Sequence, residues 1–193
     1  MLPATLLNSK FDQGLDYDRY LTTATAQQQE AWRKVHERTA LTTDQRSLIG
    51  SFMREMKVIC LSGAWCGDCS AQGPMLARIA EANPGMIHLR WLDRDEHVDL
   101  SQQVMICGGL RVPTVVFMAE DGEFCGLLGD RTVARYRAIA ARKLGAACPL
   151  PWAEAANAGG DEAGATLQDW VDEFERIQLM LRLSPRLREK HGD

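Results

Sequence analysis

Residues 57–75 read KVICLSGAWCGDCSAQGPM and hold a pair of cysteines separated by two residues. The first seven residues form a mostly apolar run that includes β-branched side chains, which predicts a short buried strand. The segment 66–82 then predicts a helix, which ends at the breaker sequence NPG at 83–85. Cys66 and Cys69 are therefore expected at the point where a strand passes into a helix.

That position predicts different chemistry for the two thiols. The first turn of a helix presents free N–H groups and the positive end of the helix dipole, and both stabilise a thiolate. Cys66 stands at this end, so we expect it to be an exposed nucleophile with a lowered pKa. Cys69 follows one helical turn later, close enough to attack a mixed disulfide on Cys66 and release the product.

The flanking sequence predicts the rest of an α/β core. Further strands are expected at 86–93, 114–119 and 123–128, and further helices at 97–106 and 132–144. The last two strands are joined by Glu120-Asp121-Gly122, which is typical of a hairpin turn. The order β-α-β-α-β-β-α predicts a parallel pair with a crossover helix, then an antiparallel hairpin. A mixed sheet with helices on both faces follows.

Residues 1–56 are expected to form a helical extension packed on this core. Spacings of three, four and seven between apolar residues predict one helix over 17–37. A second helix begins near Thr42, which fits a capping box with Gln45. Its expected buried stripe consists of Leu48, Ile49, Phe52, Met53 and Met56.

The region 146–193 is expected to contain three parts. Residues 146–165 are rich in Ala, Gly and Pro, which predicts a linker. Apolar residues from Leu167 to Leu181 recur at helical spacing and predict an amphipathic helix docked on the body. The charged tail from Ser184 is expected to fray.

The composition excludes several classes of protein. Of the 193 residues, 46% are hydrophobic and 25% are charged, which excludes a disordered chain and a fibrous repeat. No apolar run approaches the roughly 20 residues that a membrane span needs. The net charge of −4 lacks the basic excess typical of nucleic-acid binders. We therefore expect neither a membrane nor a nucleic acid among the partners.

The cysteines indicate redox chemistry in a reducing compartment. The first 14 residues lack the basic and apolar regions of a signal peptide, so a cytoplasmic protein is expected. Because that compartment keeps thiols reduced, the six cysteines do not suggest a disulfide framework. A zinc site would need two further ligands beside Cys66 and Cys69. Neither the three other downstream cysteines nor the pair His88 and His97 has a suitable spacing, so no metal is predicted.

Two clusters of charge remain open to two interpretations. The acidic residues and histidine at 93–97 fit a solvated turn that starts a helix, or else a cation site. The basic residues Arg135, Arg137, Arg142 and Lys143 fit a solvated helix face, or else a docking surface for an acidic partner. The solvated interpretation is preferred for both.

Residues 57–145 resemble the thioredoxin family. The W-C-x-x-C motif follows a strand, and Pro74 stands five residues after Cys69, where the family's helix carries a proline. The segment Val112-Pro113-Thr114 enters a strand 44 residues beyond Cys69, like the family's cis-proline segment. Gly129 follows the final hairpin at the family's glycine position.

The resemblance implies a three-layer α/β/α sandwich that exchanges thiols and disulfides without a cofactor. Cys66 would attack a protein disulfide and Cys69 would resolve it, with electrons from an unidentified donor. Pro113 would be cis, and the backbone of Val112 would pair with an extended substrate segment. The residues expected to bind substrate are Trp65, Gly67, Val112, Pro113 and Gly129.

The sequence departs from the family at several positions, and the lysine that usually pairs with the family's buried acid has no counterpart at 89–95. Cys60 stands where thioredoxins bury an acid, and Ser62 stands where they carry a tryptophan. Cys60 is interpreted as a packing residue, with a third redox partner beneath Cys69 as the alternative. Asp68 stands between the two active cysteines, where its charge is expected to raise the thiol pKa. Cys60 and Asp68 are therefore the candidates for pKa tuning.

Two hypotheses of function follow. The first is a disulfide oxidoreductase that acts on proteins. The second is a redox-regulated binding module with the same fold, in which the terminal helices supply the interface and turnover is slow. A cysteine peroxidase is disfavoured because Gly63 stands where such enzymes place Thr or Ser.

Overall fold

A four-stranded mixed sheet forms the centre of the computed structural model, which describes residues 2–144 and 161–193. Its strands are β1 (Met56–Ser62), β2 (Ile87–Asp93), β3 (Thr114–Ala119) and β4 (Phe124–Gly129). They lie in the order β2-β1-β3-β4, with β2 parallel to β1 and the other neighbours antiparallel. The predicted crossover and hairpin are confirmed.

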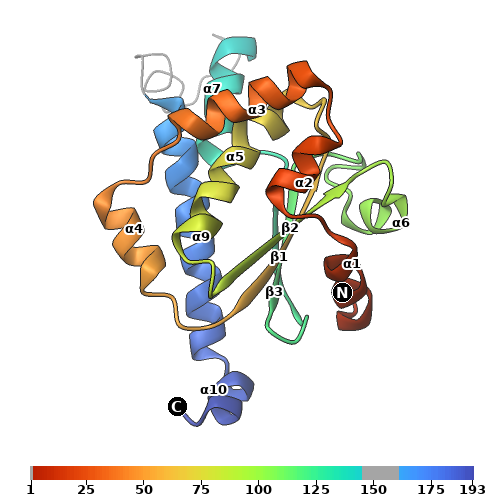
Figure 1. Cartoon of the computed structure of the whole chain (residues 1–193). Coiled ribbons are helices and arrows are strands. Elements are labelled where there is room, and N and C mark those ends of the chain that lie inside the picture. The colour runs from red at the N-terminus through yellow and green to blue at the C-terminus, as the bar shows by residue number, and fades with distance from the viewer. Residues whose placement is uncertain (1, 145–160) are drawn as a thin grey trace.

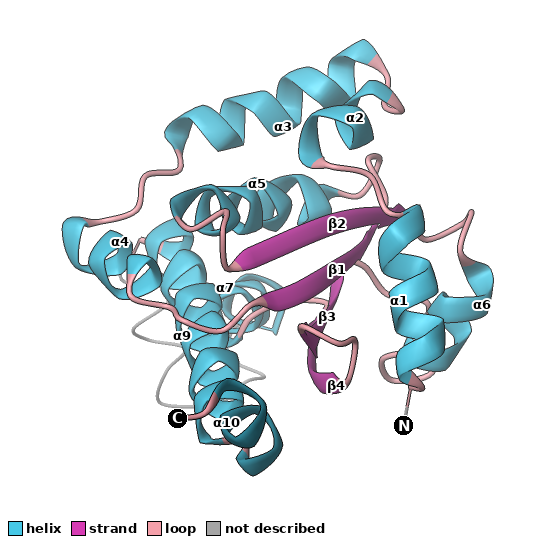
Figure 2. Ribbon diagram, turned by 60° about the horizontal axis from the view of Figure 1, so that its bottom comes forward, coloured by secondary structure: helices cyan, strands magenta, loops and turns pink. Residues whose placement is uncertain are grey.

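Helices cover both faces of the sheet (Figures 1 and 2). The helices of the described segments are α1 (Ala4–Gln13), α2 (Tyr17–Thr22), α3 (Ala26–Arg38), α4 (Thr43–Gly50), α5 (Gly67–Ala82), α6 (Val98–Ser101), the 3-10 turn η1 (Gln102–Val104), α7 (Val133–Leu144), α9 (Glu162–Leu183) and α10 (Pro185–His191). None of the helices in these segments is both long and apolar enough to cross a bilayer.

Alternate residues of β1 enter two separate hydrophobic cores. Val58 and Cys60 join the larger core, which contains side chains from α2, α3, α5 and α9. Ile59 and Leu61 join the smaller core, which contains side chains from α1 and α6. The helix α5, which begins at the two cysteines, therefore lies on the face that α2, α3 and α9 also cover.

The expectation of one helix over 17–37 is wrong, because a short non-helical segment separates α2 from α3. Thr25 caps α3: its hydroxyl accepts from the Gln28 N–H, and the Gln28 side chain accepts from the Thr25 N–H. This local capping box outweighs the continuous apolar spacing. The break lets Tyr20 of α2 and Trp32 of α3 both pack on Trp91 of β2.

The rest of the N-terminal extension shows one confirmed element and two corrections. The capping box of Thr42 and Gln45 is present and begins α4. The predicted stripe is wrong at Met53, which is 66% exposed. Phe52 and Met56 are buried as expected, but Phe52 follows the end of α4 and Met56 belongs to β1. The helix α1 has no counterpart among the expectations. Leu7 and Phe11 of α1 are buried, so this helix covers one face of the sheet.

The C-terminal amphipathic helix is confirmed, but the frayed tail is wrong. Trp170 and Phe174 of α9 are fully buried in the larger core. The tail forms α10 and buries Leu187, while Arg186 pairs with Asp121 of the β3–β4 turn. Most of the predicted linker lies outside the described residues, and its last four residues belong to α9.

Candidate active site

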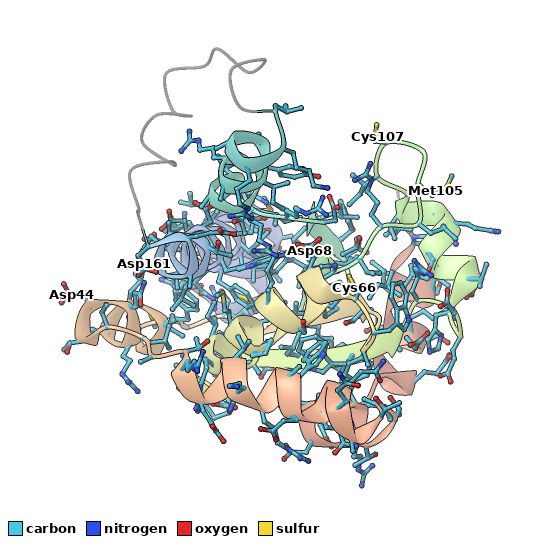
Figure 3. The ribbon with its side chains drawn as sticks, turned by 90° about the horizontal axis from the view of Figure 1, so that it is seen from above. Asp44, Cys66, Asp68, Met105, Cys107 and Asp161 are labelled. Atoms are coloured by element: carbon cyan, nitrogen blue, oxygen red, sulfur yellow. The ribbon has the colours of Figure 1, made fainter. Side chains whose placement is uncertain are left out.

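Cys66 and Cys69 stand at the beginning of α5, at the end of β1. Cys66 is the N-cap residue, with extended backbone angles, and its carbonyl accepts from the Ser70 N–H at 3.0 Å. Its side chain is half-buried, whereas Cys69 is fully buried one turn later. Figure 3 shows Cys66 and Asp68 together where α5 starts. Only the first thiol is therefore within reach of a partner molecule.

The two thiols differ in acidity as well as exposure. A hydrogen bond from the Cys69 thiol lowers the pKa of Cys66 to about 6, although burial opposes the shift. The backbone N–H groups of Asp68 and Cys69, in the first turn of α5, act in the same direction. Burial raises the pKa of Cys69 well above its ordinary value. These shifts favour the thiolate at Cys66 and the protonated thiol at Cys69.

The segment before β3 forms a second wall of the site. The Val112–Pro113 peptide bond is cis, and the Cys66 sulfur lies 3.6 Å from the Val112 carbonyl oxygen. Gly129, at the end of β4, lies directly against this segment. A Cβ atom at Gly129 would stand 2.6 Å from the Pro113 carbonyl oxygen, so only glycine allows this approach.

The surface beside Cys66 is formed by an aromatic ring and small residues. Trp65 is 52% exposed, and the guanidinium of Arg94 lies 4.7 Å from the centre of its ring. Arg94 also donates to the Leu110 carbonyl at 3.0 Å, which holds it beside the loop before Val112. A Cβ atom at Gly67 would meet no other atom within 4 Å. The half-buried thiol thus opens onto an uncrowded face.

Asp68 forms ion pairs with two arginines, and its charge acts to raise the pKa of Cys66, as expected. Its carboxylate accepts from Arg131 at 2.5 Å and from Arg135 at 2.9 Å. Burial would raise the pKa of Asp68, but these hydrogen bonds outweigh it and the pKa is lowered. The solvated-face interpretation is therefore wrong for Arg135, which also pairs with Glu162 of α9.

Comparison with known proteins identifies the family. The sequence profile described as Thioredoxin matches residues 14–141. This chain belongs to the thioredoxin family. The match includes β1, both cysteines, the segment before β3 and the hairpin, and it extends into the helices that precede β1.

Two solved structures share the fold at low sequence identity. A protein of unknown function from Pseudomonas aeruginosa is 20% identical, with a TM-score of 0.65 over 86% of this chain and 93% of that one. An HIV epitope scaffold is 18% identical, with a TM-score of 0.63 over the same shares of the two chains. Mitochondrial thioredoxin 3 from Saccharomyces cerevisiae is 28% identical, with a TM-score of 0.33 over 51% of this chain and 86% of that one. The first two comparisons extend the similarity to most of the terminal helices.

Several residues of this thioredoxin-family site were not anticipated from the sequence. Asp130 is buried directly after Gly129 and pairs with Arg111 and Arg131. The fully buried Gln72 donates to the Asp130 carbonyl at 3.0 Å and accepts from Trp170 of α9 at 3.3 Å. The available signal was a polar Gln inside an apolar helix, since a buried amide needs partners.

The other described cysteines lie apart from this pair. Cys60 is fully buried in the same core as Cys69, and burial raises its pKa. Cys107 is exposed on the loop after η1, away from Cys66 in Figure 3, and Cys125 is half-buried on β4. Cys148 lies outside the described residues. Within the described segments, no three Cys, His, Asp or Glu side chains gather as a metal site.

Proposed function

We propose that this thioredoxin-family chain reduces protein disulfides, with Cys66 as the nucleophile and Cys69 as the resolving thiol. The asymmetry of the pair carries the proposal. Cys66 is half-exposed with a pKa lowered to about 6, and Cys69 is fully buried with a raised pKa. A nucleophile must meet the substrate as a thiolate, whereas a resolving thiol must be kept from reacting with other molecules.

The proposed cycle transfers two electrons to the substrate. The Cys66 thiolate attacks one sulfur of the substrate disulfide and forms a mixed disulfide, while the other sulfur leaves as a thiolate. Cys69 then loses its proton, attacks Cys66 and releases the second substrate sulfur. The chain is left with a Cys66–Cys69 disulfide, and an external dithiol donor must reduce it. A reducing compartment such as the cytoplasm suits this direction.

The substrate is proposed to lie across the segment before β3. An extended peptide would pair with the backbone of Val112, next to Pro113 and Gly129, because strand addition brings its sulfur to the half-exposed Cys66. The ring of Trp65 and the open backbone at Gly67 would border the peptide. Selectivity then comes from backbone pairing, which favours disulfides in flexible or unfolded segments.

Reduction of insulin by dithiothreitol tests the proposal. We expect the wild-type chain to accelerate the reduction, and Cys66→Ser to abolish the acceleration because no nucleophile remains. Cys69→Ser should accumulate a mixed disulfide with the substrate. Cys107→Ser is the matched control, because Cys107 is the exposed thiol that lies away from Cys66.

The assay also separates the two hypotheses of function. A wild-type rate equal to that of dithiothreitol alone would contradict the oxidoreductase. It would favour the binding module if the chain then binds a partner in one oxidation state of Cys66 and Cys69 only.

A further inference from the structure

The buried thiol of Cys69 has no evident route for its proton. To attack the mixed disulfide it must lose that proton, yet it is fully buried and burial raises its pKa. The residue at the position of the family's buried acid is Cys60. Its own thiol is fully buried with a raised pKa, so it is a poor proton acceptor. Another group must serve the resolving step.

Ser62 lies on the same face of β1 as Cys60, because side chains two residues apart share a face. In the parallel register Cys60 lies beside Trp91 and Ser62 beside Asp93. Cys60, Trp91 and Cys69 belong to one core cluster, so this face of the sheet looks toward α5. The Ser62 hydroxyl is fully buried and has no hydrogen-bond partner that meets ordinary geometry within residues 2–144 and 161–193.

Tyr20 of α2 packs on the same face of the sheet, against Trp91. Its ring stacks on Trp91, with centroids 5.4 Å apart and planes 22° apart, and the residue is 1% exposed. Its hydroxyl is likewise buried without a partner of ordinary geometry in the described segments. Burial raises the pKa of both Tyr20 and Cys69, and for each group the nearby Ser62 side chain opposes that shift. Ser62 therefore stands between the phenol and the thiol.

A cavity continues from Tyr20 to the surface. It has a volume of about 200 Å³, and its lining includes Tyr20, Trp91 and Asp93. Its lining also includes the exposed residues Gln13, Thr23 and Glu96, so it opens to solvent. At this size it admits several water molecules. Two buried hydroxyls thus lead from the resolving thiol to a polar, accessible space.

We propose that the hydroxyls of Ser62 and Tyr20 carry the proton of Cys69 to this cavity while Cys69 attacks the mixed disulfide. The Cys69 S–H passes its proton to the Ser62 oxygen, and the Ser62 O–H passes its own proton to Tyr20. The Tyr20 O–H passes its proton to water in the cavity or to the carboxylate of Asp93. Each hydroxyl gains one proton and loses one, and Cys69 becomes the thiolate that attacks. The proposal rests on the proposed roles of Cys66 and Cys69.

A single-turnover reaction with dithiobis-nitrobenzoate isolates this step without a protein substrate. Below one equivalent of reagent, Cys66 displaces one coloured thiolate as it attacks, and Cys69 displaces the second as it resolves the mixed disulfide. We expect Tyr20→Phe and Ser62→Ala to slow the second release by roughly tenfold or more, as for a lost proton-transfer group. The first release should keep its wild-type rate. Because both residues act in one chain, the double variant should be no slower than the slower single variant.

Tyr17→Phe is the matched control. Tyr17 belongs to the same helix and the same aromatic cluster, and its hydroxyl is also buried without a partner of ordinary geometry in the described segments. The charged groups that act on it are Glu81, Asp18, Arg78 and Arg33. Neither thiol is among them, so both releases should keep wild-type rates. Thermal unfolding of each variant checks that the core is intact.

Three results would overturn the relay. They are wild-type second release in both Tyr20→Phe and Ser62→Ala, equal slowing in Tyr17→Phe, or equal slowing of both releases. If the chain failed to reduce insulin but showed a normal second release with dithiobis-nitrobenzoate, only the proposed function would be contradicted. The reagent reports the reactions of the two thiols directly.

Discussion

At the scale of single residues, the charge beside the thiolate is set by Asp68 and its two arginines. Asp68→Asn removes the carboxylate and leaves Arg131 and Arg135 without this partner. Both changes favour the thiolate, so the pKa of Cys66 should fall below about 6 and the disulfide should become more oxidising. Lost ion pairs in this mostly buried place should also cost about 1–2 kcal/mol of folding stability.

The pH dependence of iodoacetamide alkylation measures this pKa. The rate at Cys66 should rise as pH increases and level off above the pKa, at lower pH in the variant than in the wild type. Glu81→Gln is the control, because Glu81 pairs with Arg78 at the far end of the same helix. A raised pKa in Asp68→Asn would show that its effect on the thiol is not electrostatic.

The same residues show how far the site could be predicted from sequence. The difference between Cys66 and Cys69 is local: a three-residue spacing at a helix start determines which thiol is exposed. The partners of Asp68 are not local, since Arg131 and Arg135 stand 63 and 67 residues away in sequence. The expectation therefore had the correct sign for the carboxylate but lacked the charges that neutralise it.

At the scale of elements, the end of β4 packs against the Val112–Pro113 segment that lies beside Cys66. Gly129 pairs with Thr114 in the β3–β4 register. A Cβ atom at Gly129 would lie 2.6 Å from the Pro113 oxygen and 3.0 Å from the Thr114 Cα. These are backbone atoms, so Gly129→Ala must shift the segment itself. We expect a loss of about 1–3 kcal/mol in the free energy of unfolding and slower insulin reduction.

Gly85→Ala is the matched control for that substitution. A Cβ atom at Gly85 would meet nothing within 4 Å, so stability and insulin reduction should stay near wild type. Urea denaturation gives the free energy of unfolding of both variants. If Gly129→Ala kept wild-type stability and rate, the close approach of β4 to Pro113 would not matter for the site.

The elements that the sequence predicted well are those with a strong local pattern. The four strands combine apolar runs with turn residues at their ends, and all were located to within a residue or two. The errors arose where a tertiary contact or a cap competes with periodicity. Thr25 breaks an apolar repeat, and α10 depends on Leu187 and on ion pairs with the β3–β4 turn.

At the scale of the whole molecule, α3 and α9 from the two terminal extensions pack against α5, the helix that carries the cysteines. Gly73 of α5 permits this packing: a Cβ atom there would lie 2.4 Å from the ring of Trp32 in α3. Trp170 of α9 reaches the same helix through Gln72. The mixed sheet followed from the order of elements, but such contacts join segments distant in sequence and had no local signal.

Ion pairs also tie both ends of the chain to the body, which predicts acid sensitivity. Asp99 pairs with Lys10 at 2.8 Å, and Glu120 pairs with Lys190. Both carboxyl groups have a lowered pKa, with the lysine hydrogen bond as the largest cause. Asp193 likewise has a lowered pKa beside Arg54, which fixes the last residue of the chain to the body.

A lowered pKa in the folded state means that the unfolded chain binds protons first as pH falls. The stabilisation is complete above the ordinary carboxyl values of 3.8 and 4.5, and it disappears as pH falls through the lower folded values. The thermal midpoint should therefore stay nearly constant between about pH 7 and pH 5 and drop below about pH 4. Circular dichroism melts at these pH values measure it. Glu120→Gln should reduce the midpoint at neutral pH and flatten the acid drop, because it removes one titrating pair. A drop of the same depth in this variant would show that the pair with Lys190 contributes nothing to stability.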